Sequence, residues 1–124
     1  MYNIKNNNTN LVGGIPMRQN DFFIIQYHIL NHLYSSMKEK DTLPNTKCFS
    51  PDTYSINKKY FDRIVAYTYK NGLIDGLTIK GTLQPDISNT NAAYITDEGI
   101  RYLFVDPLMK EAKMYIDGEK EWDF

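Results

Sequence analysis

The chain has 124 residues, with 14 Lys and Arg against 15 Asp and Glu, so its formal net charge is −1. This length suits one domain with a modest core, and a hydrophobic content of 42%, with ten Tyr and six Phe, is typical of a folded globular protein. The near-neutral charge excludes the overall positive field of a strong nonspecific nucleic-acid binder. Any DNA binding must therefore rest on a local basic patch.

The cysteine count and the hydropathy pattern exclude further classes of protein. Cys48 is the single cysteine, so neither an internal disulfide nor a cysteine metal cluster is expected. No catalytic base adjoins it in the sequence, so we expect a small buried side chain. No apolar run reaches the roughly 18 residues of a membrane span, and residues 1–17 lack the apolar centre of a signal peptide. These patterns predict a cytoplasmic protein with no membrane partner.

Composition divides the chain into three parts. Residues 1–19 are rich in Asn and predict a flexible leader, and residues 117–124, DGEKEWDF, predict an acidic tail. Residues 20–116 are predicted to form one domain between them.

The first periodic segment is NDFFIIQYHILNHLYSSMKEKD, residues 20–41. Its apolar side chains recur at helical spacing and predict one long amphipathic helix. They are Phe22, Ile25, Ile29, Leu33 and Met37, with Leu30 and Tyr34 beside them. Asn20 or Asp21 is expected to cap the first turn. The connector TLPNTKCF follows, and we predict a short extended piece around residues 47–49.

Two further helices are predicted close together. In SPDTYSI, Ser50 suits a helix cap and Pro51 the first helical position, where a missing amide hydrogen costs nothing. Asn57 supplies the next cap, and the helix after it is expected to run to about Asn71. Gly72 can then adopt the left-handed conformation that ends a helix. The sharp turn near residue 56 gives the spacing of a helix-turn-helix motif.

Two strands and two more helices complete the domain. The segments LIDGLTIKG and AAYIT are predicted to form a hairpin around the polar loop TLQPDISNTN, as in the wing of a winged helix. Thr96, with acidic residues after it, starts the helix TDEGIRYLFV, and Asp106 with Pro107 starts the last helix, PLMKEAKMYI. The predicted fold is mainly α with a small β-hairpin, a winged helix-turn-helix domain.

The candidate binding face lies on the third predicted helix, NKKYFDRIVAYTYKNG. At 100° per residue, one arc of about 100° is mostly basic and holds Lys59, Asp62, Arg63, Ala66 and Lys70. Tyr60, Ile64 and Tyr67 lie on the other side. The surrounding residues 47–70 include five basic and two acidic side chains, a balance of +3, whereas residues 106–124 have three basic and six acidic ones, a balance of −3.

These side chains have distinct expected roles on double-stranded DNA. Arg63 suits a guanine edge, and Lys59 and Lys70 suit phosphates. Ala66 would let the helix approach the bases closely, and Lys58 and Lys80 would add supporting charge. Asp62 opposes phosphate contact unless it pairs with Lys58 or Lys59 or accepts from a cytosine amine. The competing interpretation is an ordinary solvated helix face, since surfaces are normally about a quarter charged or more.

Catalytic and metal chemistry have little support in the sequence. His28 and His32 are four residues apart, a spacing that can place two imidazoles on one metal, but no third ligand is evident. No phosphate-binding glycine loop, nucleophile elbow or paired-carboxylate motif is present. We therefore expect no enzymatic activity, no metal and no cofactor.

A second function class remains open. Tyr and Trp are favoured at protein interfaces, and the chain has more aromatic side chains than a small core readily holds. The alternative is a protein-interaction module on a winged-helix scaffold, which binds another protein such as a host factor. The first and last predicted helices could pack on a second copy, and a homodimer would give a weak DNA-binding domain two half-site contacts.

Three segments carry a resemblance to a known family. They are DFFIIQYHILNHLY, INKKYFDRIVAYTYKNGLIDG and YITDEGIRYLFVDPLMKEA, and the last contains the pattern Ile-Thr-x-x-Gly-x-x-Tyr-Leu at Ile95, Thr96, Gly99, Tyr102 and Leu103. With these residues the chain resembles the YjcQ-like proteins, small winged-helix proteins of Gram-positive bacteria and their phages, over roughly residues 21–115. The resemblance implies a winged-helix fold and a regulator role inferred from that fold.

Overall fold

The computed structural model describes residues 11–12, 15–16, 21–39, 45 and 47–117. Its helices are α1 (Asp21–Lys38), α2 (Pro51–Tyr54), α3 (Lys58–Lys70), α4 (Asp97–Val105) and α5 (Pro107–Ile116), with a 3₁₀ turn, η1 (Thr90–Ala92). Its strands are β1 (Leu11–Val12), β2 (Ile15–Pro16), β3 (Ile74–Asp75), β4 (Thr78–Lys80), β5 (Asp86–Ser88) and β6 (Tyr94–Ile95). The fold is mainly α-helical with small antiparallel sheets, as predicted.

The ends of the chain are only partly described. Within the predicted leader, β1 pairs antiparallel with β2, and the other leader positions lie outside the described residues. Of the predicted acidic tail, only Asp117 is described, and its carboxylate lies 2.5 Å from Lys113 Nζ. The predictions of a flexible leader and an acidic tail are therefore not tested.

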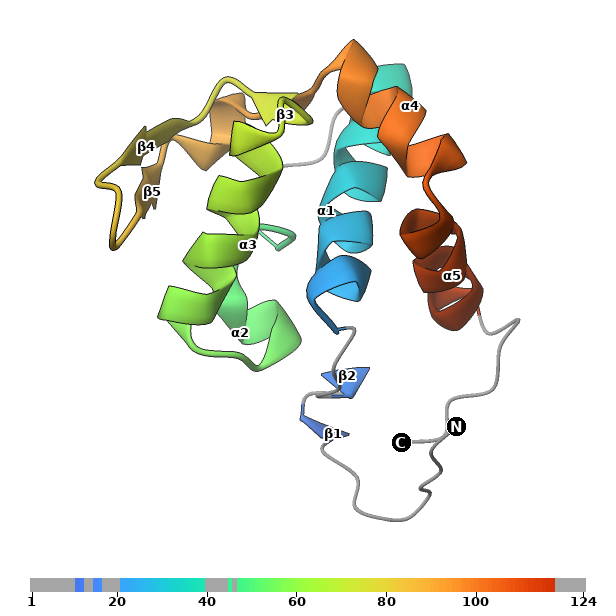
Figure 1. Ribbon diagram of the computed structural model, residues 1–124, viewed down its shortest axis with the longest axis horizontal. Coiled ribbons are helices and arrows are strands. Elements are labelled where there is room, and N and C mark those ends of the chain that lie inside the picture. The colour runs from blue at the N-terminus through green and yellow to red at the C-terminus, as the bar shows by residue number, and fades with distance from the viewer. Residues whose placement is uncertain (1–10, 13–14, 17–20, 40–44, 46, 118–124) are drawn as a thin grey trace.

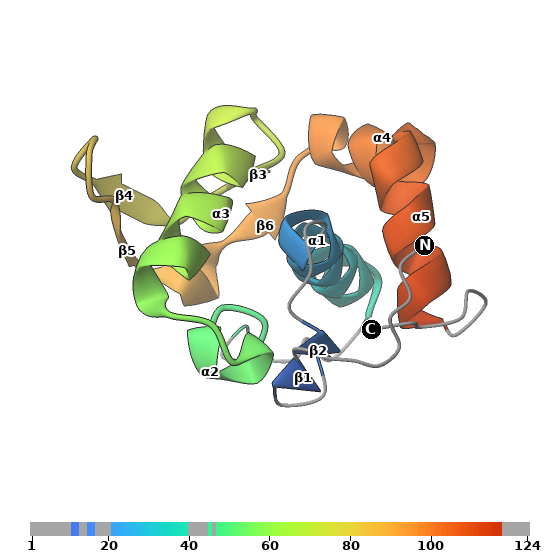
Figure 2. The same cartoon turned by 60° about the horizontal axis from the view of Figure 1, so that its bottom comes forward.

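Helix α1 occupies the centre of the domain. Figures 1 and 2 both show it between α3 on one side and the α4–α5 pair on the other, and it contacts all three helices. Its buried face is apolar, with Ile25, Ile29 and Leu30 fully inaccessible to solvent. The predicted stripe is wrong at its end, because Met37 is 56% exposed.

Two of the three capping predictions for the helix-turn-helix are confirmed, at Asn57 and Gly72. Asn57 Oδ1 accepts a hydrogen bond from Tyr60 N at 2.8 Å, and Gly72 follows α3 with φ +75°. Ser50 stands at the N-cap of α2 before Pro51, but its side chain makes no capping hydrogen bond. Ser55 adopts a left-handed conformation, φ 56°, which lets the chain reverse between α2 and α3.

The connector before α2 differs from the prediction. Residues 47–49 form a turn rather than an extended piece, because Phe49 N donates to Asn45 O at 3.1 Å. Two further bonds fix the turn: Thr53 Oγ1 donates to Lys47 O at 2.7 Å, and the Tyr54 hydroxyl donates to Cys48 O at 3.0 Å. The Cys48 side chain is buried, as predicted, and burial raises the pKa of its thiol to about 12.

The strand pairing confirms one part of the predicted hairpin and corrects another. Strand β3 in LIDGLTIKG pairs antiparallel with β6 in AAYIT, with Ile74 opposite Ile95, as predicted. The partner of β4 is instead β5, with Ile79 opposite Ile87, and β5 lies inside the segment predicted to be a polar loop. We call the β4–β5 hairpin, residues 78–88, the wing. The chain turns early because Gly81, with φ +87°, reverses it directly after β4.

The two C-terminal helices begin where predicted. Thr96 Oγ1 accepts from Gly99 N at 3.0 Å, and Asp106 Oδ1 accepts from Leu108 N at 2.8 Å. Gly99 also allows α4 to approach the end of α3, since a Cβ there would lie 2.1 Å from the Leu73 carbonyl oxygen. The Ile-Thr-x-x-Gly pattern therefore has a packing reason as well as a capping one.

A buried hydrogen-bond network connects α1, α3 and α4. Gln26 on α1 is completely buried, and its Nε2 donates to Thr68 Oγ1 on α3 at 3.0 Å. The Tyr102 hydroxyl on α4 donates to Gln26 Oε1 at 2.8 Å. Thr68 in turn donates to Ile64 O at 2.8 Å. One side-chain amide thus fixes the relative positions of α1, α3 and α4.

A second polar contact joins α1 to α2. His28 Nδ1 lies 2.8 Å from the Tyr54 hydroxyl oxygen. Because that hydroxyl donates its own hydrogen to Cys48 O, Nδ1 must carry the proton and donate to Tyr54. Burial, with the charge of His32 as a smaller cause, lowers the pKa of His28 below its ordinary value.

Replacing Gln26 by Leu should destabilise the domain. The change removes the acceptor of the Tyr102 hydroxyl and the donor to Thr68 Oγ1, which keeps its bond to Ile64 O. We expect a cost of about 2 kcal/mol in the free energy of unfolding. Urea denaturation measures the loss, and Asn31→Leu on the exposed side of α1 is the matched control, with an expected change within about 0.5 kcal/mol. Equal stabilities of the two variants would contradict the role of the network.

His28 should make stability dependent on pH. Its pKa in the folded protein lies below the 6.5 of the unfolded chain, so the unfolded state binds the proton first as the pH falls. The contribution of His28 is complete above the unfolded pKa and is lost as the pH falls through the folded one. In thermal melts between pH 7.5 and about 5, His28→Gln should lose less stability than the unmodified chain. An equal loss of stability in the two proteins as the pH falls would show that His28 does not cause the pH dependence.

Candidate nucleic-acid interface

The exposed face of α3 carries three basic side chains. Lys59, Arg63 and Lys70 are all solvent-exposed, and about 40° of arc contains them on a helical projection. Within the described part of the chain, none of them forms an ion pair. Their charges therefore point into solvent without compensation.

Two residues of the predicted basic arc on α3 are buried instead of exposed. Asp62 and Ala66 are each 6% exposed, and the prediction that they lie on the open face is wrong. Helix α3 contacts β5, and these two positions lie toward one edge of the predicted arc. The reason is the wing, which covers this edge, so Ala66 serves close packing inside the protein.

Asp62 has a partner on its own helix. Lys58 Nζ lies 2.6 Å from Asp62 Oδ2, one of the two pairings predicted for this carboxylate. The pKa of Lys58 is raised, first by this hydrogen bond and also by the negative charges of Asp62 and Asp86. Lys58 keeps its positive charge, but the nearby carboxylates offset part of it. Lys58 therefore attracts an anionic partner less strongly than Lys59 does.

Tyr67 is more exposed than predicted. The helical projection places it on the side of α3 opposite the basic arc, but its side chain is 44% exposed. Its position, about 80° from Lys59, places it at the border of the two faces. The ring packs edge-on against Phe22, with centroids 5.2 Å apart, and its remaining surface faces solvent.

The wing adds a small, mostly uncharged tip. Lys80 is exposed at the end of β4, directly across from Asp86 in the β4–β5 register. Beyond it lie Thr82 and Gln84, both exposed, and Leu83, which is 90% exposed. The tip can therefore offer hydroxyl and amide groups to a phosphate backbone, but little net charge.

The two histidines do not converge on one point. His28 bonds to Tyr54, whereas His32 Nε2 lies 3.5 Å from Ser36 Oγ. In the described segments, no cluster of three or more His, Cys, Asp or Glu side chains has the proximity required to hold a metal ion. None of the described helices has the length and apolar character needed to cross a membrane.

The sequence comparison identifies the family. The family model of the YjcQ protein matches residues 27–122. This chain belongs to the YjcQ family. The YjcQ match covers α1 from Tyr27 onward, α2 to α5 and the wing, so it includes each of the predicted DNA-binding residues. Neither the curated proteins nor the solved structures gave a match.

Gly81→Ala should weaken the wing selectively. The left-handed backbone at this position is unfavourable for Ala, and the new Cβ would lie 2.8 Å from the Gln84 carbonyl oxygen. We expect a local cost of about 1 to 3 kcal/mol, visible as faster amide exchange within residues 78–88. Gly72→Ala is the control, because it has a similar φ of +75° and open space around it. If both variants leave exchange in the wing unchanged, Gly81 does not determine this turn.

Proposed function

We propose that this YjcQ family member is a non-enzymatic protein that binds double-stranded DNA in the cytoplasm, as a phage-related transcriptional regulator. One observation carries the proposal: Lys59, Arg63 and Lys70 form an exposed, uncompensated basic face on the helix that follows α2 and precedes the wing. In winged helix-turn-helix domains this is the helix that enters the major groove.

The spacing along α3 suits that role. Lys59 and Lys70 are 11 residues apart, a rise of about 16 Å along the axis, while the major groove is about 12 Å wide. The two lysines can therefore reach phosphates on either side of the groove. Arg63 lies between them, where a guanidinium can bond to a guanine edge in a bidentate manner. Lys80 on the wing would contact the neighbouring backbone.

The modest charge of the face implies weak binding by one copy. Three uncompensated cations provide few phosphate contacts, and affinity for DNA depends strongly on their number. A homodimer would bind two half-sites at once and increase the apparent affinity without new contacts. We therefore propose a dimer as the DNA-bound form.

A protein-binding function is the second candidate. Phe104, Val105 and Leu108 are 53%, 62% and 41% exposed, on adjacent parts of α4 and α5. Exposed apolar clusters of this kind are common at protein interfaces. A pull-down from cell extract with and without nuclease separates the candidates, because DNA-mediated partners are lost in the treated arm.

The DNA proposal is tested by replacing Lys59, Arg63 and Lys70 together with Ala. Removing two phosphate contacts should lower the slope of log affinity against log salt by about two, and loss of Arg63 should reduce discrimination among sequences. Fluorescence anisotropy with a pool of duplexes at low salt measures both effects.

The matched control replaces Lys38, Arg101 and Lys110, which lie on α1, α4 and α5, with Ala. This triple variant has the same change in net charge, and it should retain the salt slope. Equal losses in the two variants would indicate nonspecific electrostatic binding. A complete lack of binding by the unmodified chain at low salt would contradict the proposed function itself.

A further inference from the structure

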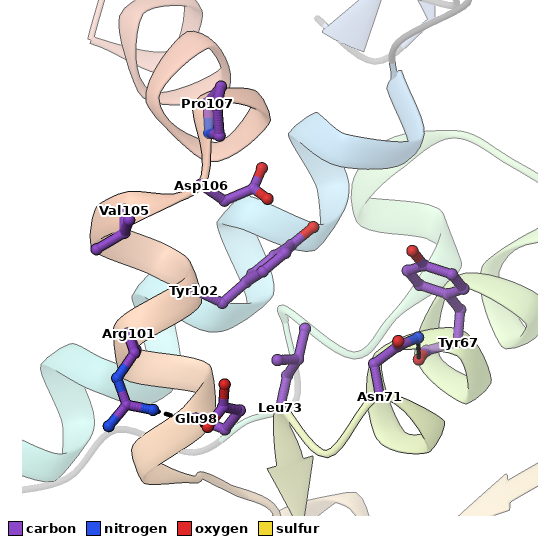
Figure 3. A pocket seen from close by; sticks show the side chains of 9 residues that line it. All are labelled: Tyr67, Asn71, Leu73, Glu98, Arg101, Tyr102, Val105, Asp106 and Pro107. Atoms are coloured by element: carbon purple, nitrogen blue, oxygen red, sulfur yellow. Dashed lines mark hydrogen bonds and ion pairs between the residues drawn. The ribbon is translucent and has the colours of Figure 1, made fainter.

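A groove separates the C-terminal end of α3 from the α4–α5 corner. Its volume is about 440 Å³, within the range of small-molecule sites. Figure 3 shows Tyr102 and Asp106 extending from the α4 side toward α3, where Tyr67 and Asn71 lie. None of the residues predicted to bind DNA lines this groove, so it is a separate site.

Two aromatic rings and two carboxylates line the groove, and one of the carboxylates, Glu98, is paired with Arg101. Tyr67 contributes a ring from α3 and Tyr102 a ring from α4, and Asp106 joins α4 to α5 between them. Burial raises the pKa of Tyr102 to about 12, with the negative charge of Asp106 as the next cause, so its hydroxyl stays neutral. Among the described residues, Asp106 has no ion-pair partner.

The groove is poorly suited to an anion. The guanidinium of Arg101 is already paired with Glu98, at 2.8 Å. Helix α5 begins at the groove, but its first amides are occupied, because Asp106 Oδ1 accepts from Leu108 N at 2.8 Å and Asp106 O accepts from Met109 N at 3.1 Å and Lys110 N at 3.0 Å. Pro107 has no amide hydrogen. No free amide remains there for a carboxylate or phosphate.

The same groove is favourable for a cation. The helix dipoles do not decide the sign of its potential, because the negative end of α3 at Asn71 and the positive end of α5 at Pro107 both border it. The faces of tyrosine rings attract cations through their quadrupole. Asp106 adds a full negative charge, with Oδ2 left for a ligand because Oδ1 caps α5. The unpaired carboxylate and the two rings thus favour positive charge in one cavity.

We propose that this groove is a binding site for a small organic cation, an ammonium or guanidinium group on an apolar body. The cationic group would lie against Asp106 and the faces of Tyr67 and Tyr102, and the apolar body would pack on Leu73 and Val105, which also line the groove. The ligand would bridge α3 and the α4–α5 corner.

Choline is the probe, because its neutral isostere 3,3-dimethylbutanol and the anion 3,3-dimethylbutyrate have almost the same shape. Titrations followed by amide chemical shifts in two-dimensional NMR should show choline perturbing the groove residues Asn71, Arg101 and Val105. We expect choline to bind about fivefold or more tightly than the neutral isostere. Equal binding of the two, stronger binding of the anion, or shifts confined to other surfaces would overturn the proposal.

Two variants locate the effect. Asp106→Asn keeps a good helix cap while removing the charge, and Tyr67→Leu removes one ring from a largely exposed position. Both should abolish most of the preference for choline. The matched controls are Asp97→Asn and Tyr69→Leu, which make the same changes at exposed positions outside the groove and should retain it.

Thermal melts establish that each variant is folded, and Tyr67→Phe is the second variant at this ring, because it leaves the bond from Tyr102 to Gln26 intact. Tyr67→Phe should retain the preference, because the ring face and Asp106 remain. A preference that persists in Asp106→Asn, or that falls equally in Asp97→Asn, would disprove the assignment. The titrations contain no DNA, so their outcome is independent of the proposed DNA binding.

Discussion

The buried amide of Gln26 constrains how the helices of this domain meet. An amide in an apolar interior is costly unless its donor and acceptor are both satisfied, and here Thr68 satisfies one and Tyr102 the other. The bond to Thr68 holds α3 against α1, and the bond from Tyr102 holds α4 there. Near the start of α1, the Tyr60 hydroxyl donates to Asp21 at 2.7 Å and fixes α3 a second time. The rotation of α3 about its axis follows from these contacts.

That rotation determines which side chains of α3 are available for binding. With Thr68 directed into the core, Lys59, Arg63 and Lys70 must face solvent, and Tyr67 comes to the border beside α4. The wing then covers the opposite edge and buries Asp62 and Ala66. A single helix therefore presents a positive face on one side and one wall of a negative groove on another. The basic face and the groove lie on the same helix, but they differ in the sign of their charge. The two sites therefore suit different ligands.

Much of this domain follows from local chemistry that is visible in the sequence. Asn57, Thr96 and Asp106 each accept from a free backbone amide within the following turn, and such bonds depend only on residues close in the chain. Gly72 ends α3 for the same kind of reason. The helix order, the helix-turn-helix spacing, the exposed basic residues of α3 and the buried thiol of Cys48 were predictable on these grounds.

The tertiary structure alone decided what depends on contacts between distant segments. The sequence pattern paired residues 73–81 as a whole with residues 92–96; this holds for β3 and β6, but the apolar pair Ile79 and Ile87 and the reversal at Gly81 assign β4 to β5. Helical periodicity placed Asp62, Ala66 and Tyr67 by angle only, and it contains no information on which side the wing or α4 will cover. The groove likewise combines Tyr67 of α3 with Tyr102 of α4, which lies 35 positions later in the chain. Periodicity and capping are local properties of a chain, whereas exposure and cavities result from packing between elements.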